Sequence, residues 1–170
     1  MASPASAPAL AQGTRRDLLP PLIVLTCVAA IGAALVSQHV FDMQPCPWCV
    51  LQRLIFALIG VAALAAWTAQ VAWLRATAWG LAVLLALSGV AAALWQHFVA
   101  ASSASCNLTL ADKILAQFGL DAALPEIFQP RASCADAAVD LLGLPYEFWS
   151  LALFVLLGVA AVFGLRRTGR

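Results

Sequence analysis

Cysteines are the residues of this sequence whose type and spacing could do chemistry. Cys46 and Cys49 form a C-P-W-C motif, and Cys106 and Cys134 follow about 28 positions apart. A thiolate attacks disulfides and binds metal ions, so a C-x-x-C pair indicates redox chemistry or metal binding. The fifth cysteine, Cys27, lies in an apolar stretch, where a cysteine is usually a small buried hydrophobic residue.

The sequence around the motif predicts a helix that begins there. Pro47 suits the first helical position, which needs no N–H, so Cys46 would be the N-cap. Its sulfur would face the positive end of the helix dipole, which lowers a thiol pKa. Cys49 and Arg53 follow on the same helix face. An arginine in an apolar helix either extends its head group to the interface or is functional. We expect Arg53 to hold a thiolate or the oxygen of a polar-headed lipid such as a quinone.

The elements that must position these residues are membrane spans. Of the 170 residues, 64% are hydrophobic and only 10% are charged, whereas about a quarter are charged in soluble proteins. A helix needs about 20 apolar residues to cross a bilayer. The composition predicts an all-α membrane protein, a four-transmembrane-helix bundle that forms a single domain over residues 1–170. The predicted spans are 18–38, 50–69, 76–99 and 148–165.

Basic residues flank these spans unevenly. Six of the nine lysines and arginines fall on one side of the predicted bundle, namely Arg15, Arg16, Arg75, Arg166, Arg167 and Arg170. The positive-inside rule therefore predicts that both termini are cytoplasmic, with a tail over 1–17, and that loops 39–49 and 100–147 lie on the opposite side. No small-x-small cleavage site follows the first span near Ser37, so we expect an uncleaved anchor. The net charge of +1 offers no basic field for nucleic acid.

This topology puts all four loop cysteines outside the cytoplasm, where disulfides persist. Four cysteines allow three pairings, and the most direct one joins Cys46 to Cys49 and Cys106 to Cys134. A Cys106–Cys134 bridge would stabilise the fold by about 3–4 kcal/mol through closure of its loop. The short Cys46–Cys49 ring restricts the unfolded chain far less, so redox chemistry explains that pair better.

Two other classes of protein stay open on the cysteine pattern. A metal-handling protein would need a second set of ligands, but Cys106 and Cys134 form no C-x-x-C motif. His39 and His97 also lack a ligand-like spacing to any cysteine, so we predict no metal site. The other class is a non-catalytic membrane scaffold, in which the disulfides would only stabilise the loops.

The second outer loop carries an amphipathic pattern. Residues 108–119 combine apolar side chains with polar ones in the pattern expected of a short amphipathic helix on the outer leaflet. The apolar side chains are Leu108, Ile114, Leu115 and Phe118, and the polar ones are Asp112, Lys113 and Gln117. Such a helix would let the Cys106 segment approach the C-x-x-C pair or swing away from it. Gln96 and His97, at the outer end of the third span, fit either an interfacial polar pair or the lining of a binding site.

Together these residues resemble the DsbB family, the bacterial disulfide bond formation proteins B, over nearly the whole chain. The resemblance rests on the four-span plan, the C-x-x-C opening the second span, and Arg53 four residues after it. The Cys106 and Cys134 pair, the segment 134–144 and Trp149 also match. The vitamin K epoxide reductase-like family has its loop pair before the C-x-x-C, the reverse of the order here.

The resemblance implies a quinone-dependent oxidoreductase of the bacterial inner membrane, with the cysteine loops in the periplasm. Such a protein reoxidises a periplasmic DsbA-like thioredoxin-fold oxidase and passes electrons to ubiquinone or menaquinone. Cys106 would form the mixed disulfide with that partner, and Cys134 would then attack Cys46. The remaining implied site residues are Cys49, which faces the quinone, and the quinone-binding candidates Arg53 and His97.

Overall fold

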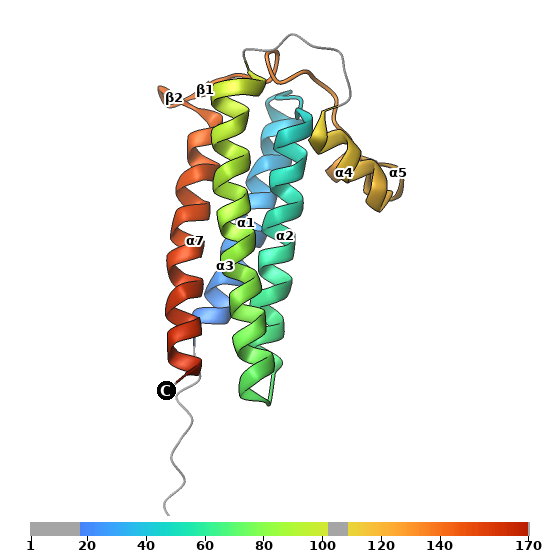
Figure 1. Cartoon of the computed structure of the whole chain (residues 1–170). Coiled ribbons are helices and arrows are strands. Elements are labelled where there is room, and N and C mark those ends of the chain that lie inside the picture. The colour runs from blue at the N-terminus through green and yellow to red at the C-terminus, as the bar shows by residue number, and fades with distance from the viewer. Residues whose placement is uncertain (1–17, 102–108, 170) are drawn as a thin grey trace, which may run out of the picture.

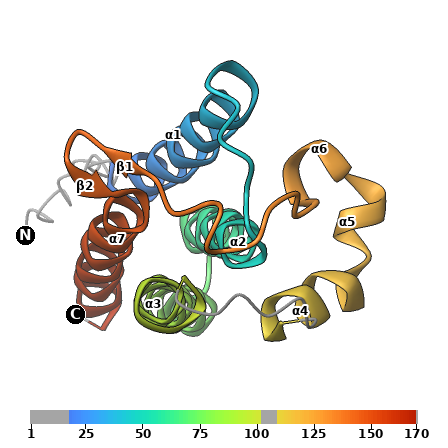
Figure 2. The same cartoon turned by 90° about the horizontal axis from the view of Figure 1, so that it is seen from above.

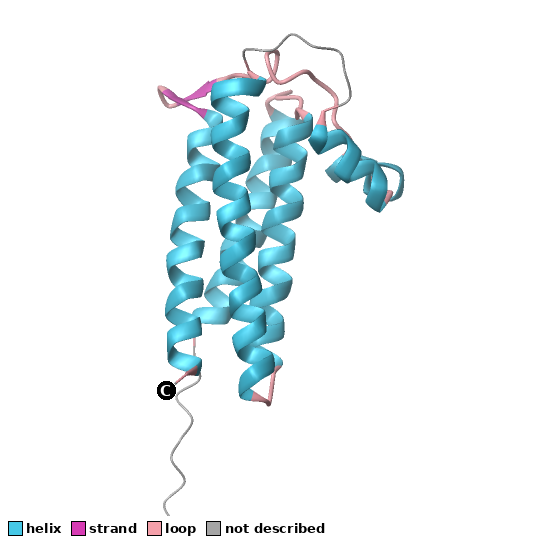
Figure 3. Cartoon of the chain, in the orientation of Figure 1, coloured by secondary structure: helices cyan, strands magenta, loops and turns pink. Residues whose placement is uncertain are grey.

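Four long helices run side by side and form a bundle (Figure 1). The computed structural model describes residues 18–101 and 109–169, so the predicted tail 1–17 and Cys106 lie outside the described residues. Each long helix is apolar and long enough to cross a membrane, and helices dominate the described chain (Figure 3). The predicted all-α four-helix fold is confirmed. The four helices are α1 (Leu19–Val40), α2 (Pro47–Thr68), α3 (Ala72–Trp95) and α7 (Tyr146–Thr168).

Short elements gather at one end of the bundle, opposite the start of α1 and the end of α7 (Figure 1). A π-helical turn, η1, continues α3, and α4 to α6 lie beside the N-terminal end of α2 (Figure 2). Helix α4 falls within the predicted amphipathic segment 108–119, whereas its periplasmic location stays a prediction. The bounds are η1 (Gln96–Ala100), α4 (Leu110–Phe118), α5 (Leu120–Ala123), α6 (Pro125–Phe128), β1 (Asp140–Leu141) and β2 (Leu144–Pro145).

Local signals set the ends of the short elements. Thr109 caps α4 through a reciprocal box with Asp112, and Gly119 ends that helix at φ 61°, in the left-handed region that suits glycine. Strands β1 and β2 pair antiparallel around Leu142 and Gly143, whose φ angles of 56° and 80° fit a two-residue type I′ turn. This hairpin delivers the chain directly to the start of α7.

Helix α2 is the centre of the bundle, since it is the most enclosed of the four long helices. Small residues let the other helices approach closely. A Cβ on Gly89 of α3 would overlap the ring of Phe154 on α7. That ring stacks on Phe56 of α2 with centroids 4.1 Å apart. Cys27 packs in the same core with 2% of its surface exposed, as expected of a small hydrophobic residue.

The outward surface of the bundle is apolar. Leu25, Leu84 and Leu156, from three different long helices, are each more than 60% exposed. A soluble protein rarely leaves such a continuous apolar surface in water, whereas lipid tails cover it at no cost. Together with the four spans, this surface identifies a multi-pass membrane protein.

Candidate redox site

The redox pair lies at the N-terminal end of α2. Cys46 is the N-cap and Pro47 takes the first helical position, as predicted. The Cys46 sulfur accepts a hydrogen bond from the Cys49 N–H at 3.3 Å, and the two sulfurs lie 2.9 Å apart. Cys46 is completely buried. The four described cysteines, Cys27, Cys46, Cys49 and Cys134, carry free thiols, so the predicted pairing of Cys46 with Cys49 stays a prediction.

Cys134 joins this pair from the second loop. The thiol of Cys46 hydrogen-bonds the Cys134 sulfur, which also accepts from the Trp48 N–H. The backbone holds the two loops together, because Arg131 donates its N–H to the Pro45 carbonyl at 2.9 Å. Three sulfurs therefore meet at the N-terminus of one membrane span. Cys106 lies outside the described residues, so its predicted pairing with Cys134 stays a prediction.

The two contacting thiols differ in acidity. The hydrogen bond from Cys46 holds the pKa of Cys134 below its ordinary value, although burial opposes this. The pKa of Cys46 is instead raised, first by its hydrogen bonds to Cys134 and Cys49 and then by burial. The dipole-based prediction of an acidic Cys46 was therefore wrong. Cys134 is the better placed thiolate nucleophile and Cys46 is the sulfur that it contacts.

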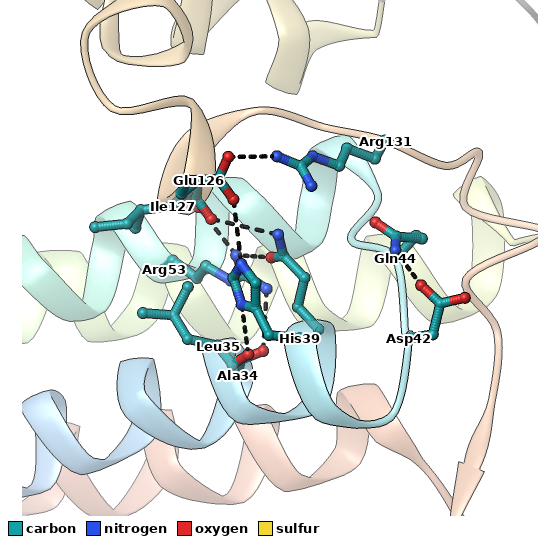
Figure 4. A network of polar contacts seen from close by, with 10 residues as sticks. Ala34, Leu35, His39, Asp42, Gln44, Arg53, Glu126, Ile127 and Arg131 are labelled. Atoms are coloured by element: carbon teal, nitrogen blue, oxygen red, sulfur yellow. Dashed lines mark hydrogen bonds and ion pairs between the residues drawn. The ribbon is translucent and has the colours of Figure 1, made fainter.

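Arg53 is buried one turn deeper in α2, with 5% of its surface exposed. Its guanidinium donates to Gln38 Oε1 at 2.8 Å, to the Ile127 carbonyl at 2.9 Å and to the Ala34 carbonyl at 3.3 Å (Figure 4). These acceptors satisfy the charge that an apolar helix could not. Arg53 thus joins α2 to α1 and to α6, in addition to lining the same cavity as Cys49.

A second set of contacts holds α6 on the end of α1. Gln38 donates through Nε2 to the Glu126 carbonyl at 3.3 Å. The Glu126 carboxylate lies 3.1 Å from both His39 Nε2 and Arg131 Nη2 (Figure 4). These two partners, His39 first, lower the pKa of Glu126. Exposed ion pairs contribute little each, so the buried Gln38 and Arg53 contacts carry most of this attachment.

A cavity of about 250 Å³ opens beside Cys49, between α1, α2 and α7. Gln96 donates through Nε2 to the Cys49 sulfur at 3.3 Å, and Gln52 donates to Gln96 Oε1 at 2.7 Å. Phe56 and Leu153 line the cavity with apolar surface. The polar residues that line it are Ser37, Cys49, Gln52, Arg53, Gln96, Tyr146, Glu147 and Ser150.

His97 does not line this cavity itself but contacts a residue that does, Glu147. Its Nδ1 is 2.7 Å from Glu147 Oε1, and Glu147 lines the cavity. The sequence analysis predicted a role for His97 but not for Glu147 or Gln52. Gln52 is a polar residue within the predicted span 50–69, a pattern that could have identified it. Glu147 was placed in the predicted loop 100–147, whereas the structure begins α7 at Tyr146. The role of His97 in quinone binding stays a prediction.

A four-helix membrane bundle with three thiols at the end of one span defines a membrane thiol–disulfide oxidoreductase. Residues 16–164 match the family model described as disulfide bond formation protein DsbB. The chain therefore belongs to the DsbB family, whose name states that its members form disulfide bonds.

Curated relatives agree with this assignment. A disulfide bond formation protein B of Verminephrobacter eiseniae is 37% identical over 86% of this chain and 84% of its own. That of Polaromonas naphthalenivorans is 34% identical over 88% of this chain and 90% of its own. The corresponding protein of Cupriavidus metallidurans is 32% identical over 86% of this chain and 90% of its own. The resemblance stated from the sequence is confirmed.

Proposed function

We propose that this protein reoxidises a periplasmic DsbA-like thioredoxin-fold oxidase and passes the electrons to ubiquinone or menaquinone. The observation that carries the proposal is the contact of Cys134 with Cys46 while Cys49 lines a separate cavity. One pair can thus exchange with a soluble donor from the loop, and the other can release electrons toward the membrane.

Membership of the DsbB family and the contact of Cys134 with Cys46 support the following thiol steps. A partner thiolate attacks Cys106 of a Cys106–Cys134 disulfide to form a mixed disulfide, and the released Cys134 thiolate attacks Cys46 of the Cys46–Cys49 disulfide. Cys49 leaves as a thiolate beside Gln96. The partner's second thiolate attacks the mixed disulfide, which releases the oxidised partner and frees Cys106. Cys106 then attacks Cys134, so that Cys46 leaves as a thiolate, and transfer of two electrons from Cys46 and Cys49 to the acceptor would restore their disulfide.

The cavity residues fit a quinone head group. Cys49, Arg53 and Gln96 supply a thiol, a cation and an amide on its polar side, and Phe56 and Leu153 supply apolar surface. A small polar site within an apolar lining is the usual form of a ligand pocket. A bound quinone would accept two electrons and two protons, and Arg53 would stabilise negative charge that develops on it.

Purified protein tests this proposal in detergent with a short-chain ubiquinone or menaquinone and a reduced DsbA-like oxidase. One quinone should be consumed for every two partner thiols lost, and Cys49→Ala or Cys46→Ser should abolish this consumption. Cys27→Ala is the matched control, because Cys27 is buried away from the site, and it should retain activity. Turnover that survives Cys49→Ala would contradict the relay.

Orientation is part of the same proposal. We expect an inner-membrane protein with cytoplasmic termini, because the arginines at both ends of the chain lie on one side of the spans. A membrane-impermeant maleimide added to intact spheroplasts should label a cysteine placed at Asp121 and should not label one placed at Thr168. The reverse pattern would show the opposite orientation.

A further inference from the structure

Glu147 is a buried carboxyl that the thiol exchange does not use. It lies in the first turn of α7 with 5% of its surface exposed, and it lines the cavity beside Cys49. An acidic residue at this depth is costly in a membrane protein and marks a functional site by default. Its carboxylate is held at 2.7 Å by His97 Nδ1.

His97 connects Glu147 to the outer surface. Its side chain is 32% exposed, whereas that of Glu147 is 6% exposed. The imidazole packs edge-on against Phe98 and Phe148, with ring centroids 4.9 and 4.8 Å away, so its orientation is fixed. An imidazole takes up a proton on one ring nitrogen and releases one from the other. His97 and Glu147 therefore connect a partly exposed imidazole to the cavity beside Cys49.

Reduction of a quinone in the cavity would need protons, which His97 and Glu147 could supply. Oxidation of a dithiol releases two electrons and two protons, and reduction of a quinone consumes both. Two electrons enter the cavity when the reduced thiols of Cys46 and Cys49 re-form their disulfide, after Cys106 has displaced Cys46 from Cys134. The released protons, in contrast, stay on the outer aqueous side with the soluble partner. Reduction thus needs a separate route for protons into the cavity.

Glu147 is the carboxyl on the described cavity wall. The other ionisable groups lining it are Cys49, Arg53 and Tyr146. Cys49 supplies electrons, and Arg53 stays charged while it donates to three oxygens. Glu147 is the group in this set that contacts an imidazole, and that imidazole is 32% exposed.

We propose that Glu147 and His97 form a proton relay that supplies the acceptor in the cavity, a proposal that rests on quinone reduction at Cys49. Glu147 donates its proton to an oxygen of the reduced quinone. His97 replaces that proton through Nδ1 and recovers one from water through its other ring nitrogen. Two passes supply the two protons that accompany the two electrons, so the reaction balances without another reactant.

The decisive variant is Glu147→Gln, which keeps the shape and a hydrogen bond to His97 but removes the transferable proton. The turnover number for quinone reduction should fall roughly ten- to a hundredfold, since general acids contribute factors of about this size or more. The rate at which reduced partner forms its mixed disulfide, measured without quinone, should stay at the wild-type value. Asp121→Asn, which changes a carboxyl on α5 away from the cavity, should leave both rates unchanged.

A second measurement separates proton transfer from structural support. His97→Ala should lose turnover, and added imidazole should restore a large part of it, whereas imidazole should not rescue Glu147→Gln. Wild-type turnover in Glu147→Gln, or equal loss of both half-reactions, would overturn the relay. Absence of quinone reduction by the unaltered protein would instead refute the proposed function itself.

Discussion

Gln38 is one of the buried side chains that attach the second loop to the bundle. Its amide contacts α2 and α6 at once, because Oε1 accepts from Arg53 at 2.8 Å and Nε2 donates to the Glu126 carbonyl at 3.3 Å. Gln38 is 3% exposed, so water cannot replace these bonds. Gln38→Leu keeps the approximate volume and removes both. We predict that this change weakens the docking of α6 and of the Cys134 segment that follows it.

The magnitude follows from the one bond of Gln38 that crosses to the loop, the bond to the Glu126 carbonyl. The bond to Arg53 joins α1 to α2, and Arg53 keeps its contact with the Ile127 carbonyl. A neutral hydrogen bond contributes about 0.5–1.5 kcal/mol, and one of 3.3 Å belongs at the lower end, so we expect a loss of about 0.5–1 kcal/mol in loop docking. Since about 1.4 kcal/mol corresponds to a factor of ten, the ratio of docked to undocked loop falls roughly two- to fivefold.

Effective thiol concentration measures this docking directly. In a Cys49→Ala, Cys106→Ala background, equilibration with glutathione buffers gives the tendency of Cys46 and Cys134 to form a disulfide. Gln38→Leu should lower that effective concentration by the same factor, since the two sulfurs meet only when the loop is docked.

The control is Thr26→Val, an exposed position on α1 whose hydroxyl bonds only within its own helix, to the Leu22 carbonyl. It should leave the effective concentration unchanged. An equal value for Gln38→Leu and the unaltered background would refute the reasoning, since the buried amide would then contribute nothing to docking.

Two further predictions concern the thiols and the packing. The pKa of Cys134 lies below its ordinary value because Cys46 donates to it, so its thiolate persists to lower pH. The pH midpoint of Cys134 alkylation, followed by mass spectrometry, should therefore rise in Cys46→Ala, and an unchanged midpoint would contradict this cause. Gly89→Ala should cost about 1–3 kcal/mol of stability through overlap with Phe154, read as a lower thermal midpoint. Gly80→Ala, with no atom within 4 Å of the added Cβ, should not.

The sequence was sufficient for the spans and for the start of α2. Long apolar runs leave few alternatives to membrane helices, and Pro47 can take the first helical position but not an interior one. The N-cap position of Cys46 follows from that single residue. The spans and the start of α2 depend on residues that are close together in the sequence, so they can be predicted from it.

Contacts between distant segments were not predictable in the same way. Arg53 was expected near the thiols, but its acceptors belong to α1 and to residue 127, far away in sequence. The acidity of Cys46 was wrong for the same reason, because the helix dipole is local whereas the hydrogen bond to Cys134 comes from another loop. Glu147 became a candidate functional residue only because the fold places it beside His97 and the cavity.

The π turn at the end of α3 lets two consecutive side chains serve two different partners. The Ala101 N–H reaches back to the Gln96 carbonyl at 2.9 Å, five residues earlier, where an α-helix would reach back four. Gln96 contacts Cys49 while its neighbour His97 contacts Glu147. Because Gln96 and His97 begin this turn, their contacts with Cys49 and Glu147 depend on the end of α3. Deleting one of the residues that follow them in η1 would restore the α-helical register and turn the departing chain by about 100° relative to α3. The turn therefore sets the direction in which the chain leaves the third span for the second loop.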